Sequence, residues 1–517
     1  MTSPVIEKRV PDRLFEGILR ILILVLAVVA QFVLLVQLID FLRINAVYIY
    51  FFLEILALVQ VLILLNQKGI NTYSIAWIIV IMVLPVFGEL IYLFWGQSGR
   101  RSRKGRQLRT IFSRRSLWLR PDPAVCEKLR LRHPDKQRIP TYLVNQGFPV
   151  FDKTRSRYYR VGEDQFEDMF QDLEKAERFI FLEYFIVSDG QLWQRLYEIL
   201  KRKAEAGVDV RLLYDDIGSM FMVPRHLKEL LNESGIKVLA YGKAEKNIFR
   251  MYVNHRNHQK ITSIDGDIGY LGGTNLADEY ANIYPKHGHW KDTAIRLEGD
   301  AVWSLTVTFL EMWEGESGER EDYNHFRPRR LSAGDGFYQP FSDGPVNNPE
   351  NPAETVYQQM ITQARHYCYI TTPYLVVDEV MLKALCVAAE GGIDVRIVVP
   401  RVWDHWFVHK VTRSNYKRLI EAGVIIYEYT PGFMHAKMII SDDNQAVIGS
   451  INMDYRSFYL HFENGAWICD SPAVTAIKND IVETFAVSEQ HTLEMVNQTP
   501  LWDKLLQTFL RLFAPLF

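Results

Sequence analysis

The chain has few cysteines, no nucleotide-binding loop and almost no net charge. Its four cysteines are far apart in 517 residues, and no two form a Cys-x-x-Cys pair. This spacing predicts neither disulfides nor a zinc site and fits a reducing compartment. No Gly-x-x-x-x-Gly-Lys-Ser/Thr segment occurs, so nucleotide hydrolysis is not supported. A formal net charge of −2 argues against a general nucleic-acid binder, which is usually strongly basic.

One pattern of residues occurs twice. Residues 258–275 read His-Gln-Lys-Ile-Thr-Ser-Ile-Asp, then six residues, then Gly-Gly-Thr-Asn. Residues 435–452 read His-Ala-Lys-Met-Ile-Ile-Ser-Asp, then six residues, then Gly-Ser-Ile-Asn. In both copies Lys follows His by two residues, Asp follows it by seven and Asn by seventeen. The matched offsets predict a duplicated unit whose copies each supply half of one active site.

The residue types of the repeat suit a phosphodiester substrate. One imidazole attacks phosphorus and the other protonates the leaving oxygen, while ammonium and amide groups neutralise and orient the phosphoryl oxygens. The apolar residues after each Lys predict a buried strand, on which residues two apart share a face. The two Asp residues are expected to orient their neighbours by hydrogen bonding, and a purely structural role is equally open. The candidate catalytic residues are His258, Lys260, Asp265, His435, Lys437 and Asp442, and the candidate phosphate-binding residues are Asn275 and Asn452.

These residues resemble the duplicated His-Lys-Asp motif of the phospholipase D superfamily. Longer segments are similar to those of bacterial cardiolipin synthases: residues 181–186, 211–219, 372–375, 427–429 with 432–433, and 452–457 with 462–463. The resemblance implies a phosphatidyltransferase that joins two phosphatidylglycerol molecules into cardiolipin and glycerol. It also implies a phosphatidyl-histidine intermediate, with His258 as the nucleophile and His435 as the acid, although the sequence does not decide which histidine attacks. No cofactor and no metal ion are predicted.

Other functions remain open at this stage. A membrane-bound phospholipase D or another phosphatidyltransferase would use the same motif. A tethered nuclease of the superfamily would need a basic groove, which the near-neutral composition disfavours. A non-catalytic membrane scaffold would have no use for two intact motifs. The predicted partners are therefore phosphatidylglycerol and membrane lipid, without nucleic acid, and the sequence gives no sign of the oligomeric state.

Beyond residue 145, helix and strand patterns alternate. Helices are expected at 165–178, 192–206 and 380–390, and strands at 179–186, 208–214, 369–372 and 393–399. A second internal match, between residues 206–211 and 391–396, supports duplication independently of the histidine motif. The pattern predicts an α/β fold of two duplicated phospholipase D-like halves with helix-covered mixed sheets. The expected parts are a basic juxtamembrane linker (100–145), a first half (146–315), a connector (316–352), a second half (353–498) and an amphipathic C-terminal helix (499–517).

Residues 1–99 are predicted to form a transmembrane helical anchor. Apolar stretches cover residues 21–39, 47–65 and 76–95, and Pro85 and Gly88 interrupt the third. Basic residues flank the region on both sides, which places both of its ends in the cytoplasm. Three full spans would separate those ends, so the third stretch is expected to be re-entrant or the first to dip into the bilayer only. The favoured topology is a multi-pass protein of the cell membrane with two true spans and a cytoplasmic catalytic domain.

Three further features have alternative readings. The basic run at 100–109 is either a contact for anionic headgroups or a topology signal alone. The C-terminal helix either docks at the membrane interface or packs on the catalytic domain. The pairs His287 and His289, and His405 and His409, have ligand-like spacing but no accompanying Cys or Glu set. A headgroup contact or a satisfied surface histidine is favoured for both pairs.

Overall fold

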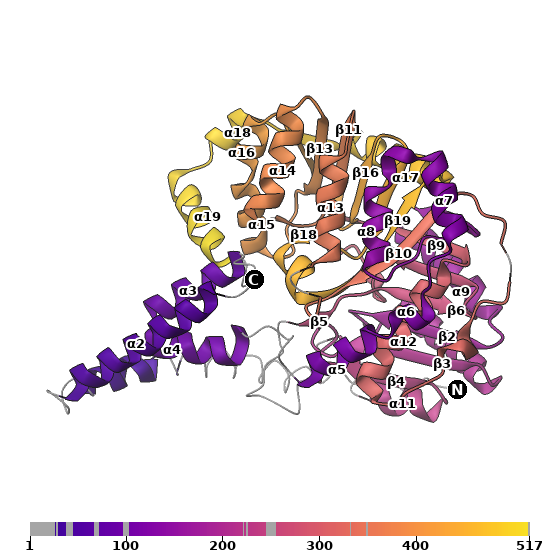
Figure 1. Cartoon of the computed structure of the whole chain (residues 1–517), viewed down its shortest axis with the longest axis horizontal. Helices are drawn as coiled ribbons and strands as arrows, with labels where there is room; N and C mark the ends of the chain where they lie inside the picture. Colours follow the sequence, from indigo (N-terminus) through magenta and orange to yellow (C-terminus); the bar gives the residue numbers. More distant parts are fainter. Residues whose placement is uncertain are drawn as a thin grey trace. The chain divides into compact units, whose positions relative to one another are not determined.

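The computed structural model describes residues 26, 29–37, 45–66, 72–96, 103–220, 222–223, 226–243, 255–330, 332–347 and 350–514. The chain forms two compact units, Met1–Gln97 and Ser98–Phe517. All of the predicted site residues lie in the second unit, which contains the two large β-sheets of the protein (Figure 1).

The first unit is helical throughout its described part. It contains α2 (Asn45–Leu65), α3 (Thr72–Val83), α4 (Pro85–Ile91) and the π-helix η1 (Tyr92–Gly96). Helix α3 ends just before Pro85, and this proline starts α4 because a proline is tolerated in the first turn of a helix but not in its interior. The predicted interruption of the third apolar stretch is therefore confirmed. Much of the first predicted span falls outside the described residues.

No helix among the described residues combines the length and the apolarity that crossing a membrane requires. The transmembrane anchor therefore stays a prediction.

Two mixed sheets of matching topology form the second unit. The first has the order β1-β9-β7-β6-β2-β3-β4, and the second has the order β10-β19-β17-β16-β11-β13-β14-β20. The strands of the first sheet are β1 (Thr154–Tyr159), β2 (Phe179–Tyr184), β3 (Asp209–Asp215), β4 (Lys237–Tyr241), β6 (Ile261–Ile264), β7 (Ile268–Gly272) and β9 (Ala294–Gly299). Those of the second are β10 (Phe337–Asp343), β11 (Tyr367–Thr371), β13 (Asp394–Pro400), β14 (Ile425–Tyr429), β16 (Met438–Ser441), β17 (Gln445–Gly449), β19 (His461–Cys469) and β20 (Ser488–His491). The run β9-β7-β6-β2-β3-β4 has its counterpart in β19-β17-β16-β11-β13-β14, so the duplication predicted from the sequence is present in the fold.

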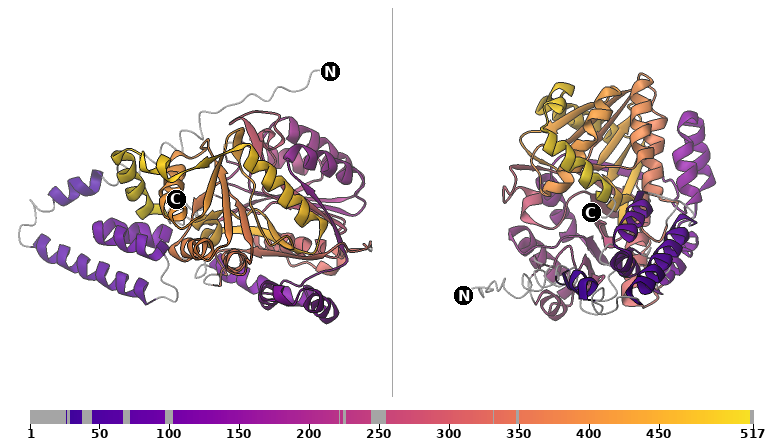
Figure 2. Two further views of the ribbon diagram at one scale, coloured as in Figure 1. Left: turned by 90° about the horizontal axis from the view of Figure 1, so that it is seen from above. Right: turned by 90° about the vertical axis from the view of Figure 1, so that its left-hand side faces the viewer.

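Helices cover both sheets. The helices of the first half are α9 (Gly162–Glu174), α10 (Gln191–Glu205), α11 (Leu227–Glu233) and α12 (Val302–Ser317). Those of the second half are α13 (Pro352–Thr362), α14 (Glu379–Glu390), α15 (Trp406–Ser414), α16 (Tyr416–Glu421), α17 (Pro472–Ala486), α18 (Leu493–Asn497) and α19 (Leu501–Phe513). Figure 2 shows strands of the second sheet between helices on either side. Central strands such as β2 are buried along their whole length, as expected for strands covered on both faces.

The two halves share one apolar core. A single cluster of buried side chains includes Ile261, Leu297 and Val302 of the first half and Met438 and Ile468 of the second. Helix α12 is buried along nearly all of its length and packs against strands of the first sheet and against β10 of the second. The halves are therefore parts of one folded unit, and their relative position fixes the site that lies between them.

Two of the ranges predicted to be connecting segments contain regular secondary structure. The range read as a connector contains β10, which pairs with β19 along its whole length. Pro340 and the polar flanks hid this strand from sequence reasoning, and β10 tolerates a proline because it lies at the edge of its sheet.

The range read as a basic linker folds into helices. These are α5 (Arg103–Phe112), α6 (Arg115–Trp118), α7 (Pro123–Arg132) and α8 (Arg138–Asn145). Arg115 of α6 forms a buried ion pair with Glu311 of α12, with Nη2 and Oε2 2.6 Å apart. This segment is therefore part of the catalytic unit. At least one of its basic residues, Arg115, stabilises the packing of that unit through a buried ion pair.

Candidate active site

Short strands that pair across the two halves position both histidines. Strand β5 (Arg256–Asn257) pairs in parallel with the start of β19, so that Asn257 lies opposite Phe462. Strand β15 (Gly432–Met434) pairs in the same way with β8 (His289–Lys291), so that Met434 lies opposite Lys291. A motif histidine follows directly after β5 and after β15. A carboxylate residue directly follows the residue that is paired with the last residue of each of these strands. The cross-half register therefore brings His258 to Glu463 and His435 to Asp292.

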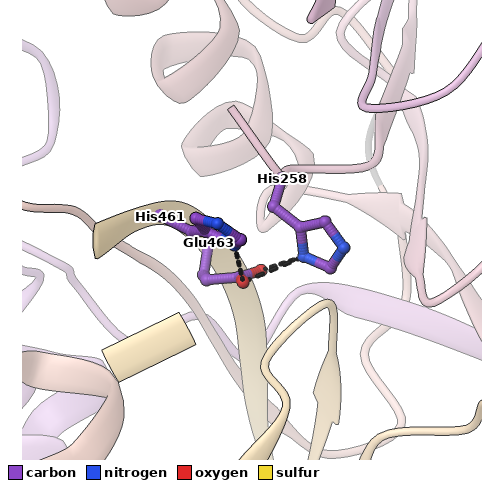
Figure 3. Close-up of side chains that lie close together, drawn as sticks. All are labelled: His258, His461 and Glu463. Carbon is purple, nitrogen blue, oxygen red and sulfur yellow. Dashed lines mark hydrogen bonds and ion pairs between the residues drawn. The ribbon is translucent and has the colours of Figure 1, made fainter. Parts of the chain in front are cut away.

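The imidazole of His258 hydrogen-bonds to a carboxylate of the second half. Its Nδ1 atom lies 2.9 Å from both carboxylate oxygens of Glu463 (Figure 3). Glu463 also accepts hydrogen bonds from the hydroxyls of Ser450 and Ser457. The backbone N–H of His258 donates to the carbonyl of Phe462 at 2.9 Å. These bonds fix the ring and its tautomer, which leaves Nε2 as the atom able to react.

The imidazole of His435 has the reciprocal arrangement. Its Nδ1 atom lies 2.6 Å from a carboxylate oxygen of Asp292, which belongs to the first half. Its backbone N–H donates to the carbonyl of Lys291 at 2.8 Å. Both carboxylates are fully buried. Each half thus supplies one histidine and the group that orients the other half's histidine.

Sequence reasoning did not identify Asp292 or Glu463 as site residues. Glu463 entered only as part of a segment similar to the family, and Asp292 did not enter at all. Asp292 follows Asn275 by 17 residues, whereas Glu463 follows Asn452 by 11, so no common offset points to them. The flanking residues include charged and polar side chains, Lys291 and Thr293 beside Asp292 and Asn464 beside Glu463, so no local pattern marked either carboxylate.

The two lysines of the repeat lie beside their own histidines. Lys260 donates from Nζ to the carbonyl of His258 at 2.6 Å. Lys437 has its Nζ 2.6 Å from the Nδ1 of His435 and also donates to the carbonyl of that residue. Both ammonium groups are buried and neither lysine lines the pocket into which the histidines open, so their binding of a phosphoryl oxygen stays a prediction. The expectation that each His and Lys lie together is thus met, although they precede β6 and β16 rather than lie on them.

The two asparagines of the repeat line the same pocket but are bonded differently. Asn275 accepts from the backbone N–H of Ile186 at 3.1 Å and donates to the hydroxyl of Tyr280 at 2.8 Å. Asn452 hydrogen-bonds to the carboxylate of Asp454, and its own Oδ1 is buried without a hydrogen-bond partner among the described residues. The repeat is therefore not symmetric at this position.

The two aspartates of the repeat lie at the far ends of their strands, away from the histidines. Asp265 accepts hydrogen bonds from the backbone N–H groups of residues 177, 178 and 179, where β2 begins. Asp442 does the same for residues 365, 366 and 367, where β11 begins. Each has a φ of 55°, because it opens the tight turn after its strand. Neither aspartate lines the pocket. The catalytic role predicted for them is therefore wrong, and the alternative of a structural role applies.

The histidines open into one pocket of about 390 Å³. Next to His435 the wall is aromatic, with the rings of Tyr280 and Trp290 at 5.4 and 5.3 Å. Next to His258 lie Phe185 and His461, with ring centroids at 5.0 and 5.5 Å. Two arginines, Arg256 and Arg456, and two carboxylates, Asp404 and Asp454, also line the pocket. The volume suits a lipid headgroup, and the acyl chains of a lipid must lie outside it.

Burial makes both imidazoles neutral before a substrate binds. Burial lowers the pKa of His258 well below its ordinary value, and the charges of Lys260 and Lys437 lower it further. Burial and Lys437 lower the pKa of His435 to about 4, against the opposing effect of Asp292. An anionic phosphodiester between the two rings opposes these causes and raises both pKa values. The proton that a histidine would need to act as an acid would therefore accompany substrate binding.

The lysines predict how activity depends on pH. Burial lowers the pKa of Lys260 to about 7 and that of Lys437 to about 8. Each amine is charged below its pKa and neutral above it, so phosphate binding weakens as the pH rises through this range. We expect kcat/KM to fall by about tenfold per pH unit between pH 7 and 8 and by about a hundredfold per unit above pH 8, where both amines lose their charge, because this parameter reports ionisations of the free protein.

A substitution that keeps the charge tests this assignment. Arginine stays protonated throughout the range, so Lys260→Arg should remove the part of the decline that begins near pH 7. Rates measured between pH 6 and 9 check both points. A wild-type profile that is level up to pH 9, or a Lys260→Arg profile identical to it, would contradict the assignment.

One group of side chains has the spacing of a metal site. The ligating atoms of His258, His461 and Glu463 lie within 4.8 Å of one another, and this is the one such group among the described residues (Figure 3). The oxygens of Glu463 already accept from one histidine and two serines, so a cation there would displace the bond that orients His258. We assign the group to hydrogen bonding. Two of the histidines whose spacing resembled metal ligands have other contacts. His289 Nδ1 lies 3.0 Å from the hydroxyl of Tyr429, and His405 lines the pocket.

Comparisons with known proteins agree with this geometry. A family model described as "Cardiolipin synthase, PLD-like domain" matches residues 169–284 and 357–484, and one described as "Phospholipase_D-nuclease N-terminal" matches residues 52–97. Cardiolipin synthases from Geobacillus kaustophilus and Halalkalibacterium halodurans are 35% and 34% identical to the chain, covering 87% and 86% of it and 90% and 89% of their own lengths. The solved structure of phosphatidylserine synthase from Haemophilus influenzae shares the fold, with a TM-score of 0.54 at 16% identity, over 74% of this chain and 98% of its own.

Proposed function

The chain belongs to the family of cardiolipin synthases with phospholipase D-like domains, and on that premise we propose that it joins two phosphatidylglycerol molecules into cardiolipin and glycerol. One observation carries the proposal. Two buried histidines, each oriented by a carboxylate of the opposite half, open into one headgroup-sized pocket. This arrangement supplies a nucleophile and an acid on opposite sides of a bound phosphodiester.

The reaction consists of two displacements at one phosphorus atom. The Nε2 atom of His258 attacks the phosphodiester of the donor lipid, and a P–N bond replaces the P–O bond to the headgroup glycerol. His435 donates its proton to the departing glycerol oxygen. A glycerol hydroxyl of the acceptor lipid then attacks, its proton passes to His435, and a P–O bond replaces the P–N bond. One phosphodiester replaces another, so no external energy source is required.

Hydrolysis by the same site is the second candidate function. Water attacking the phosphatidyl-histidine would give phosphatidic acid. The aromatic wall beside His435, formed by Tyr280 and Trp290, favours transfer, because a lipid headgroup that fills the pocket displaces water from an apolar surface next to the base. A lipid acceptor held at the membrane surface also has a high local concentration.

The assay for the proposed function uses the purified full-length protein in mixed micelles. Labelled phosphatidylglycerol is the sole lipid, and products are separated by lipid chromatography with a separate measurement of glycerol. Cardiolipin and glycerol in equal amounts are the expected products. Phosphatidic acid in place of cardiolipin would identify a phospholipase D, and the absence of any lipid product would overturn the proposal.

We propose further that the protein is a multi-pass membrane protein whose pocket faces the cytoplasmic lipid surface. The apolar stretches in residues 1–99 and the N-terminal family match support attachment to a membrane. In the catalytic unit, α19 packs on α15 and leaves an apolar face exposed, with Trp502 82% and Phe509 58% accessible. Ala514, next to the end of this helix, lines the pocket. A lipid whose headgroup enters the pocket therefore has its acyl chains near a surface suited to the membrane interface.

Charged substitutions on α19 should lower activity on bilayers alone. Leu505→Glu combined with Phe509→Glu places charge on the exposed apolar face, and we expect about tenfold or greater loss of kcat/KM with phosphatidylglycerol vesicles. Activity on a monomeric short-chain phosphatidylglycerol should change little. Asn497→Asp, which adds charge at an exposed position just before α19, serves as the control. Equal losses on vesicles and monomers would mean that the helix supports the fold and does not dock on lipid.

A further inference from the structure

The two copies of the motif differ just after their asparagines. In the first copy the residue four positions beyond Asn275 is Glu279, which does not line the pocket. In the second copy the residue four positions beyond Asn452 is Arg456, which does. Arg456 begins η8 (Arg456–Leu460), a π-helix, whereas the first copy has the 3₁₀-helix η6 (Asp278–Ala281). π-Helical turns are frequent at functional sites.

The side chain of Arg456 is positioned by a buried histidine. Its Nε atom donates to the Nε2 of His461 at 3.1 Å. Burial lowers the pKa of His461 to about 3, so this imidazole is neutral and able to accept that bond. Arg456 is close enough to His258 for its charge to lower the pKa of that ring. A guanidinium is permanently charged and planar, and its geometry matches a phosphate group.

The other charged groups of the pocket are differently placed. Arg256 is almost fully buried and forms an ion pair with Asp215 at 3.3 Å. Asp404 accepts from the hydroxyl of Tyr374, and Asp454 accepts from the backbone N–H of Ser457. Burial raises the pKa of Asp454 to about 6, which reduces its repulsion of a neighbouring anion. Arg456 is the pocket arginine that is partly exposed.

The asparagine of the second copy adds a matching hydroxyl site. Its Oδ1 atom is buried without a hydrogen-bond partner among the described residues, whereas the Oδ1 of Asn275 accepts from Ile186. An amide oxygen only accepts hydrogen bonds, so it suits a hydroxyl donor and not the phosphate oxygens for which Asn452 was predicted. Hydroxyl and phosphate are the two polar parts of a phosphoglycerol headgroup. The residues suited to bind them, Asn452 and Arg456, lie four positions apart in the second half.

We propose that Asn452 and Arg456 form the subsite for the acceptor lipid, with Arg456 binding the acceptor phosphate that does not react. The proposal rests on the proposed function, because a cardiolipin synthase must hold a second phosphatidylglycerol while the first is attached to the histidine. The acceptor hydroxyl lies at Asn452, and its own phosphodiester is neutralised by Arg456. An anionic lipid is thereby selected over water and over uncharged alcohols as acceptor.

The test measures how one intermediate is divided between two acceptors. Full-length protein in mixed micelles receives labelled phosphatidylglycerol together with ethanol, and cardiolipin and phosphatidylethanol are quantified from the same reaction. Both products derive from the same phosphatidyl-histidine, so their ratio does not depend on the donor step. We expect Arg456→Gln to lower the ratio of cardiolipin to phosphatidylethanol by about 10- to 100-fold, as for the loss of charged hydrogen bonds. Arg456→Lys, which keeps the charge without the fork, should give an intermediate ratio.

The remaining outcomes are distinguishable. Arg401→Gln removes an exposed arginine that is paired with Glu489 and should leave the ratio unchanged. An unchanged ratio in Arg456→Gln, with either full or reduced total activity, would overturn the acceptor subsite while leaving the synthase function intact. A wild-type protein that forms neither product would instead overturn the proposed function.

Discussion

Replacing His435 with alanine should separate the two halves of the reaction. With natural phosphatidylglycerol we expect a loss of activity on the order of 10⁴-fold or more, because no group protonates the departing glycerol. A donor that carries a p-nitrophenyl group needs no such protonation. His435→Ala should therefore release about one equivalent of p-nitrophenol and retain the phosphatidyl group on His258. Intact-protein mass spectrometry and peptide mapping would detect the adduct.

The complementary variant should behave differently with the same donor. His258→Ala lacks the nucleophile, so we expect neither an initial burst of p-nitrophenol nor a covalent adduct. Its loss of activity on natural phosphatidylglycerol should be comparable to that of His435→Ala. His491→Ala, which changes a partly exposed histidine on β20, is the matched control and should remain active. A burst in His258→Ala and none in His435→Ala would reverse the two roles. A burst in neither would exclude a phosphatidyl-histidine.

The carboxylates that cross between the halves should be the next most sensitive positions. We expect Glu463→Gln and Asp292→Asn each to lower kcat by about 10²- to 10⁴-fold with little change in KM. An amide at either position cannot hold the same histidine tautomer or stabilise the imidazolium that forms. Steady-state kinetics with phosphatidylglycerol in micelles would measure the effect.

The reciprocal pairing makes a sharper distinction with the p-nitrophenyl donor. Glu463→Gln should slow the burst, because Glu463 orients the nucleophile His258. Asp292→Asn should leave the burst largely intact, because Asp292 orients the acid that this donor does not need. Asp343→Asn is the matched control, since burial already raises the pKa of Asp343 to about 7 and the residue contacts no motif histidine. Equal effects of both variants on the burst would show that the carboxylates act through general stability.

Much of the fold was predictable because its signals are local. The helix expected at 192–206 is α10 (Gln191–Glu205), and the strand expected at 393–399 is β13 (Asp394–Pro400). Apolar periodicity and the glycines after each helix were sufficient for these elements. Strand β10 was missed because Pro340 disguises it, and its assignment depends on pairing with β19, more than 120 residues later.

The sequence by itself determined the chemistry of this protein, and the tertiary structure decided how that chemistry is assembled. A repeated His-Lys-Asp-Asn spacing is a local property, so it predicted the reacting histidines and the duplication that the two sheets share. Equal spacing could not show that Asp265 and Asp442 bind strand-starting amides, because partners 87 and 76 residues away decide that role. Nor could it reveal Asp292 and Glu463, which meet their histidines only through strand pairing between the halves. Such register is set by packing over the whole unit, and no periodicity within either segment encodes it.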